Sequence, residues 1–269
     1  MFKARLLTSI ILAPLALYAV FELPLLPFAL LLDLVLLLAA WEWANLSGYQ
    51  QQPARLTYTA LLGLGLVAAH LLQPVLPVPV VLAGALLFWL VALVWVVRFP
   101  ATCGWQQLWQ RALVGWLVII PCWFALVALK AMPQAELWLL CLLLLVWGAD
   151  VGAYVAGKTF GRHKLAPQVS PGKTREGLLG GLLTCASVGI GFSVWLELDV
   201  LSGVLMVLLA IVTGLMSVLG DLFESMLKRA RGIKDSSRIL PGHGGILDRI
   251  DSLTAAAPFF VFWLHFISV

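Results

Sequence analysis

The sequence predicts an all-α, polytopic integral membrane protein with about nine transmembrane helices. Of the 269 residues, 62% are hydrophobic and only 11% are charged, whereas an average soluble domain is about 45–50% apolar and about 25% charged. So few charges cannot cover a water-facing surface of this size, which excludes a soluble enzyme, a disordered protein and a fibrous repeat. The apolar residues also gather in runs of about 20, the length that a helix needs to cross a bilayer.

Nine apolar runs follow one another, separated by short polar turns. Lys3 and Arg5 precede the first run as in a signal peptide, but no small-x-small cleavage site follows, and Pro24 leads directly into the second run. We therefore expect an uncleaved first helix. We divide the chain into an N-terminal segment of about five helices, 1–140, and a C-terminal region with the polar motifs, 141–269. The runs cover residues 6–21, 24–41, 57–73, 79–97, 112–130, 135–157, 178–196, 201–226 and 252–268.

The basic residues predict how the chain is oriented in the membrane. With the N-terminus in the cytoplasm, nine helices place all of the 17 Lys and Arg residues except Lys130 on the cytoplasmic side. Because basic residues are translocated poorly, we expect a cytoplasmic N-terminus and a C-terminus outside. Two cytoplasmic loops, 158–177 and 227–251, are longer than the others and hold most of the basic residues. Any chemistry is therefore expected at the cytoplasmic membrane face.

A first polar cluster ends the sixth apolar run. Asp150, Tyr154 and Gly157 are four and three residues apart, which places them on one face of a helix. An ionisable Asp is costly in a membrane helix and is therefore a candidate functional residue. Small residues recur around it at helical spacing and favour close helix packing. The segment from Gly152 to Thr159 matches the P-loop pattern formally, but no strand precedes it, so we reject a P-loop.

Two further clusters lie in the long cytoplasmic loops. The first, 170–177, precedes a helix N-terminus, where unpaired amides attract anions; the alternative is a basic loop that only maintains topology. The second, 221–251, interleaves carboxylates that suit Mg²⁺, cations that suit phosphates, and glycines that let the backbone approach a ligand. This pattern predicts a site for a Mg²⁺-nucleotide or a phospholipid phosphate at the inner membrane surface.

The second cluster resembles the signature of the phosphatidate cytidylyltransferases, the CDP-diacylglycerol synthases. That signature runs Ser-x-hydrophobic-Lys-Arg, then Lys-Asp, a small residue, Leu-Pro-x-His-Gly-Gly and Asp-Arg-x-Asp, and every part occurs within 225–251. The family's Asp-x-x-Ala-Tyr-x-x-Gly and Ser-Pro-x-Lys-Thr-x-Glu-Gly motifs occur at 150–157 and 170–177. The similarity is strong over 147–268, whereas 1–140 resembles the family only in being apolar.

The resemblance implies transfer of a cytidylyl group from CTP to phosphatidate, giving CDP-diacylglycerol and pyrophosphate for membrane phospholipid synthesis. It implies Mg²⁺ dependence, with Asp221 and Asp248 as metal ligands and the number of ions left open, a bacterial inner-membrane location and a homodimer. No nucleic acid is expected as a partner. We expect catalytic roles for Asp221, Lys228, Arg229, Lys234, Asp235, His243, Asp248, Arg249 and Asp251. We expect substrate binding by Asp150, Tyr154, Ser170, Lys173, Thr174, Glu176, Glu224, Ser225, Gly244 and Gly245.

Two other functions remain open from the sequence. A small-molecule transporter would need ionisable groups spread through the middle of the membrane, where only Asp33 lies deep in a run, with Glu42 near the end of another. A different CTP-using lipid enzyme, such as a polyprenol kinase, would transfer the γ-phosphate and release CDP. Identifying the product that is released from CTP therefore separates the three functions.

The cysteines are expected to be packing residues, and some of the tryptophans to anchor helices. The four Cys residues lack C-x-x-C spacing, so we expect neither a disulfide framework nor a metal site, and only apolar packing. Of the 12 Trp residues, Trp41, Trp43 and Trp105 are expected to anchor helices at the membrane interface.

Overall fold

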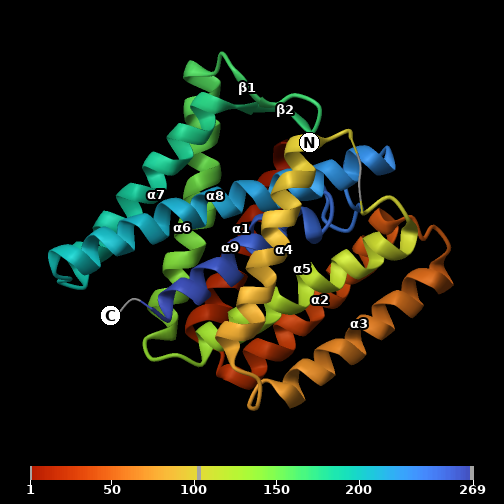
Figure 1. The fold of residues 1–269 in the computed structure, drawn as a ribbon, viewed down its shortest axis with the longest axis horizontal. Helices are drawn as coiled ribbons and strands as arrows, with labels where there is room; N and C mark the ends of the chain where they lie inside the picture. The colour runs from red at the N-terminus through yellow and green to blue at the C-terminus, as the bar shows by residue number, and fades with distance from the viewer. Residues whose placement is uncertain (1, 102–103, 267–269) are drawn as a thin grey trace.

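The structure, a computed structural model, describes residues 2–101 and 104–266, with the side chains of 2–9 left out. The described residues form nine helices and one two-stranded hairpin, so the expected all-α fold is confirmed apart from the hairpin. Figure 1 shows these elements. The helices are α1 (Phe2–Phe21), α2 (Leu25–Ser47), α3 (Gln52–Leu72), α4 (Val78–Arg98), α5 (Leu108–Lys130), α6 (Ala135–Phe160), α7 (Arg175–Trp195), α8 (Val200–Arg231) and α9 (Leu247–Leu264). The strands are β1 (Lys164–Ala166) and β2 (Ser170–Thr174).

Seven of these helices, α2 to α8, are long and apolar enough to cross a membrane, which makes the chain a multi-pass membrane protein. The expected count of about nine is therefore met only in part among the described residues. The apolar stretch described in α1 is Ile10–Phe21, shorter than the seven. Helix α9 has 18 residues and begins with Asp248, Arg249 and Asp251, so part of its length is charged. These charged residues belong to the candidate site described below.

Several helices extend beyond the apolar runs, most clearly α8, which continues to Arg231. Asp199 caps its N-terminus by accepting hydrogen bonds from the backbone amides of Leu201 and Ser202. The hydrogen bonds from Ser202 lower the pKa of Asp199. At the other end, Gly232 takes the left-handed conformation, with φ of 72°, and ends the helix after Arg231. Polar residues predicted for a loop are consequently held on a helix, with fixed directions.

Helices α6 and α7 pack closely through small residues, as the sequence predicts. A Cβ atom added to Gly181 would lie 2.7 Å from the carbonyl oxygen of Ala149, and one added to Gly177 would lie 2.9 Å from that of Ala153. The two backbones thus approach more closely than any larger side chain would allow. Because the segment that matches the P-loop pattern is helical within α6, the rejection of a P-loop is confirmed.

Helix α9 lies near the centre of the molecule, between the group α6–α8 and the group α2–α5 (Figure 1). It packs against α8, α5 and α4. Ala256 and Phe260 are fully buried along it. The N-terminal end of α9, which carries the signature carboxylates, is therefore held between both groups of helices.

Asp33 and Lys130, two ionisable residues of the apolar helices, both have partners on other parts of the chain. Asp33 on α2 lies 2.8 Å from His70 on α3. Lys130 donates to the carbonyl oxygen of Val20 at 2.6 Å and lies 3.4 Å from Glu136. Pairing reduces the cost of placing such groups in lipid, so these residues connect helices.

The tryptophans are more deeply buried than the sequence predicts. Trp43 and Trp105 are each only 1% exposed, so the expectation that they anchor the protein at the interface is wrong; both are packed in the core. The guanidinium of Arg55 stacks over the ring of Trp41, with 3.3 Å between Cζ and the ring centroid. Among the cysteines, Cys103 lies outside the described residues, and the three others are buried free thiols: Cys122, Cys141 and Cys185.

Candidate active site

The loop between α6 and α7 folds into a short antiparallel hairpin that the sequence does not predict. Lys164 pairs with Thr174, and Ala166 pairs with Ser170. Thr174 also caps α7 by accepting a hydrogen bond from the amide of Gly177 at 3.1 Å. In Figure 1 the hairpin extends sideways from the ends of α6 and α7. It returns the chain toward α8 and so directs Lys173 at that helix.

Glu176, in the first turn of α7, holds the hairpin in place. Its carboxylate accepts hydrogen bonds from the amides of Arg162 and His163, at 3.1 and 3.2 Å, and from the His163 ring at 2.6 Å. Arg229 on α8 donates through Nε to the carbonyl oxygen of Val169, at 3.1 Å. These contacts link the hairpin to both neighbouring helices.

A cavity of about 350 Å³ opens between α6, the hairpin, α7 and α8. Its walls combine charged and apolar groups, as a site for a lipid phosphate requires. The predicted residues among those that line it are Asp150, Tyr154, Lys173 and Thr174.

Lys173 and Asp150, which line this cavity, belong to an ion-paired cluster that extends to α8. Lys173 Nζ lies 2.7 Å from Asp221 Oδ2, and both side chains remain about a quarter exposed, at 24% and 29%. Ser225 donates to Asp221 Oδ1 at 3.2 Å. Asp150 interacts electrostatically with Lys173, Asp221 and Arg249. The motifs at 150–157 and 170–177 thus meet α8 at one place, and solvent can reach it.

A second ion pair lies deeper, between α8 and α9. Lys228 Nζ lies 2.7 Å from Asp248 Oδ1 and 3.4 Å from Glu224 Oε1, and all three side chains are buried. Asp251 interacts electrostatically with Glu224. Glu224 and Asp251 also share a side-chain hydrogen bond, which requires a proton on one of the two carboxyl groups, so Lys228 and this shared proton together balance the buried carboxylates.

Glycines let the signature loop wrap tightly around Asp248. Asp248 Oδ2 accepts hydrogen bonds from the amide and hydroxyl of Ser236, at 3.0 and 2.9 Å, and from the amide of Gly245 at 2.7 Å. Gly244 has a φ of 82°, and a Cβ atom there would lie 2.6 Å from Asp248. Leu240 donates its amide to the carbonyl oxygen of Gly244 at 2.8 Å. Only glycine at position 244 allows both the turn and this close approach.

Glu42 on α2 supports the same loop from the opposite side, and the sequence does not reveal this role. It is fully buried. Its carboxylate accepts hydrogen bonds from the backbone amides of Ile246 and Leu247, at 3.0 and 2.6 Å. It also accepts hydrogen bonds from the hydroxyls of Ser236 and Ser237. These two amides begin α9, so the carboxylate sits at the positive end of that helix. Because Glu42 lies about 200 positions from its partners, no local motif signals the contact.

The chain matches the cytidylyltransferase family over residues 3–267. It belongs to this family. It is 48% identical over 261 residues to a phosphatidate cytidylyltransferase of Pseudomonas aeruginosa, covering 97% of this chain and 96% of the relative. A phosphatidate cytidylyltransferase of Haemophilus influenzae is 37% identical over 296 residues, covering 99% and 100%. The resemblance inferred from the motifs is thereby confirmed.

Some predicted site residues of this cytidylyltransferase lie away from the ion-paired cluster. Lys234 and Asp235 are exposed on the signature loop. Tyr154 is 66% exposed at the rim of the cavity, and its ring lies 5.7 Å from Lys158 Nζ. His243 donates its amide to the carbonyl oxygen of Leu240 at 3.0 Å, within the turn. Their roles in the reaction stay predictions.

The side chains of this cytidylyltransferase offer only a partial set of metal ligands. No group of three or more His, Cys, Asp or Glu side chains in the described residues is arranged to hold a metal ion. Mg²⁺ usually takes one or two protein carboxylates and completes its shell with substrate phosphates and water. Asp221 fits this requirement because it is partly exposed, whereas Glu224, one turn further along α8, is buried beside Lys228 and hydrogen-bonded to Asp251. Asp248 fits only if a cation replaces its contact with Lys228.

Proposed function

We propose that this chain transfers the cytidylyl group of CTP to phosphatidate, giving CDP-diacylglycerol and pyrophosphate. Two phosphatidate cytidylyltransferases match it over nearly their whole lengths, and this observation carries the proposal. The ion-paired cluster supports it, because it provides cations for phosphates beside a carboxylate for Mg²⁺. The cavity next to the cluster has apolar walls that suit a substrate with acyl chains.

In the proposed reaction, a phosphate oxygen of phosphatidate attacks the α-phosphorus of CTP, and pyrophosphate leaves. A phosphate monoester is already an anion near neutral pH, so strong general-base assistance is unnecessary. The main barrier is the repulsion between two polyanions, and positioning and electrostatic stabilisation are the means to lower it. Lys173 and Arg249 border Asp150 and are placed to neutralise the incoming phosphates. Lys228 keeps the buried carboxylates balanced.

Mg²⁺ belongs to this proposal through Asp221, with Asp248 as the second ligand that the family implies. Bound there, it would neutralise negative charge between neighbouring phosphate oxygens. The chain's own contribution is to hold Asp221 in place, through Ser225 and Lys173. Lys173 would then exchange Asp221 for a substrate phosphate.

The membrane arrangement follows from the charges. We propose a cytoplasmic N-terminus, a C-terminus outside and an active site at the cytoplasmic face of a bacterial inner membrane, because this orientation keeps nearly all basic residues inside. CTP then arrives from water, while the acyl chains stay in the leaflet. A homodimer remains part of the proposal on the resemblance alone.

Product identification tests the proposed function. The purified protein receives Mg²⁺, radiolabelled CTP and either phosphatidate or a polyprenol. With phosphatidate we expect pyrophosphate and labelled CDP-diacylglycerol, and no reaction with the polyprenol. Chelation by EDTA should stop turnover, and added Mg²⁺ should restore it. Release of CDP together with a phosphorylated polyprenol would overturn the proposal, as would full turnover in EDTA.

A further inference from the structure

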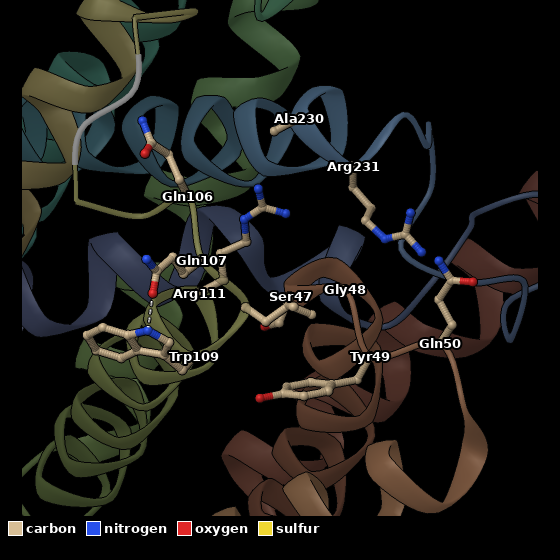
Figure 2. Close-up of a pocket in the computed structure, with 11 residues that line it drawn as sticks. Ser47, Gly48, Tyr49, Gln50, Gln106, Gln107, Trp109, Arg111, Ala230 and Arg231 are labelled. Atoms are coloured by element: carbon tan, nitrogen blue, oxygen red, sulfur yellow. Dashed lines mark hydrogen bonds between the residues drawn. The ribbon is translucent and has the colours of Figure 1, made fainter.

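A second and larger cavity lies on the far side of the α8 C-terminus from the ion-paired cluster. Its volume is about 790 Å³. It opens between the end of α2, the segment that leads into α5 and the last turn of α8 (Figure 2). The side chains that give it its chemistry are Tyr49, Gln50, Gln107, Trp109, Arg111 and Arg231.

Two guanidinium groups dominate the charge of this cavity. Arg111 donates through Nε to the carbonyl oxygen of Trp105 at 3.1 Å, and Arg231 donates through Nε to that of Asn45 at 3.2 Å. These bonds fix both side chains and leave the terminal amino groups of each fork beside the cavity (Figure 2). The two groups are close enough to repel each other. Within the described residues, neither forms an ion pair, and no carboxylate lines the cavity.

Fixed, unbalanced arginines in a cavity favour a phosphate ligand. The planar fork of Arg matches the oxygens of a phosphate, and charge-assisted hydrogen bonds of this kind are among the strongest in proteins. An anion between Arg111 and Arg231 would also remove their mutual repulsion. The cavity is large enough for a complete lipid headgroup or a small soluble phosphate compound.

The rim of the cavity favours a lipid as the source of that phosphate. Trp109 is 59% exposed and Leu108 is 50% exposed at the first turn of α5. An exposed indole beside polar groups at the end of an apolar helix is typical of the membrane–water interface. Acyl chains would contact this apolar rim while the phosphate reaches the arginines.

The cavity is separate from the active site but connected to it through one residue. Lys228 points from α8 to Asp248, whereas Arg231, three positions later, bonds to α2. Asn45 accepts the bond from Arg231, and its side chain donates to the carbonyl oxygen of Ser236 at 3.3 Å. Ser236 in turn holds the signature loop, so an anion bound here would reinforce a contact that positions the active site.

We propose that this cavity is a binding site for a phosphate-bearing anion, held by Arg111 and Arg231. The apolar rim favours the phosphate of an anionic membrane lipid over a soluble phosphate. The site is distinct from the place where CTP and phosphatidate react, and the proposal does not depend on the reaction.

Counting the bound lipids by native mass spectrometry tests this proposal. The purified protein is titrated with phosphatidylglycerol, with the zwitterionic phosphatidylcholine and with inorganic phosphate. We expect the wild-type protein to retain one phosphatidylglycerol saturably. The Arg111→Gln/Arg231→Gln protein should bind it at least about tenfold more weakly, since both charge-assisted contacts to the phosphate are lost. Arg98→Gln, an exposed arginine outside the cavity, is the matched control and should bind as the wild type does.

The competition arm identifies the source of the phosphate. Retention of phosphatidylglycerol that inorganic phosphate does not displace supports a lipid, and arginine-dependent binding of inorganic phosphate alone supports a soluble ligand. Equal binding of phosphatidylglycerol by wild-type and double-variant proteins would overturn the site. The site would also be overturned if the wild-type protein bound neither phosphatidylglycerol nor inorganic phosphate saturably. This second result does not depend on whether the double variant folds.

Discussion

The two aspartates that the family resemblance nominates as metal ligands have different surroundings. Asp221 is partly exposed and paired with Lys173, whereas Asp248 is buried and has hydrogen bonds or ion pairs on both oxygens. A partly exposed pair exchanges partners at a lower cost than a buried one, because solvent still screens it. A buried pair is expensive to break. Substrate should therefore engage Lys173 and Asp221 first, with Asp248 acting also as a support for the signature loop.

Replacing Lys173 tests the role of the exposed pair. We expect Lys173→Gln to lower the rate of CDP-diacylglycerol formation by roughly 10- to 100-fold, the effect of losing one charge-assisted contact to a phosphate. Lys164→Gln, in the same hairpin but outside the cluster, is the control and should retain most of its activity. Equal activities of the two variants would show that Lys173 does not contact substrate.

Glu42 offers a test of support from the N-terminal half of the chain. In Glu42→Gln, an amide donor replaces one of the oxygens that accept the amides of Ile246 and Leu247. One unsatisfied buried donor costs about 1–3 kcal/mol, so we expect the loop to loosen and kcat to fall about tenfold or more. Glu22→Gln, at an exposed glutamate, should have no effect.

A purely stabilising role for Glu42 would give a different result. The Glu42→Gln protein would then unfold at a lower temperature but turn over normally below that temperature. Measuring kcat and thermal unfolding on the same preparations separates these outcomes.

At the scale of elements, the close contact of α6 and α7 fixes where Asp150 and the hairpin stand relative to α8. Gly181 faces α6 with no room for a Cβ atom, while Gly191, on the same helix, has open space around it. Alanine is otherwise the better helix former, by about 1 kcal/mol. The two positions therefore separate the packing requirement from helix propensity.

We expect Gly181→Ala to destabilise the protein by about 1–3 kcal/mol, because the added methyl group must separate the helices. Gly191→Ala should leave stability unchanged or slightly raised. Thermal unfolding in detergent, followed by tryptophan fluorescence, measures both. A Gly181→Ala protein as stable as the wild type would show that the helices do not pack as described.

The sequence predicts the elements of this fold better than the contacts between them. Apolar runs locate the helices because burial in lipid requires continuous hydrophobic residues. The hairpin is missed because strands of three and five residues, one containing Pro171 and Gly172, have no alternating apolar pattern. The family resemblance nominates Asp221 and Asp248 as metal ligands, but nothing local links Glu42 to the loop it supports. Such contacts depend on tertiary structure alone.

At the scale of the whole molecule, the topology depends on its two terminal helices. Seven helices are long and apolar enough to cross the membrane, and α1 and α9 decide whether the termini lie on the same side. We expect a reporter fused to the N-terminus to be active only in the cytoplasm and one fused to the C-terminus only outside. Cytoplasmic signals from both would show that either α1 or α9 does not cross the membrane.

The most direct test of the central claim compares two aspartates of α8, one at its N-cap and one in its C-terminal half. Asp221→Asn removes a charge from the ion-paired cluster, whereas Asp199→Asn changes only the helix cap, which Asn can also form. With equal amounts of each protein in the membrane, we predict that CTP-dependent pyrophosphate release falls by at least about 100-fold in Asp221→Asn and stays near the wild-type rate in Asp199→Asn. A fully active Asp221→Asn enzyme would contradict the assignment of the active site to this cluster.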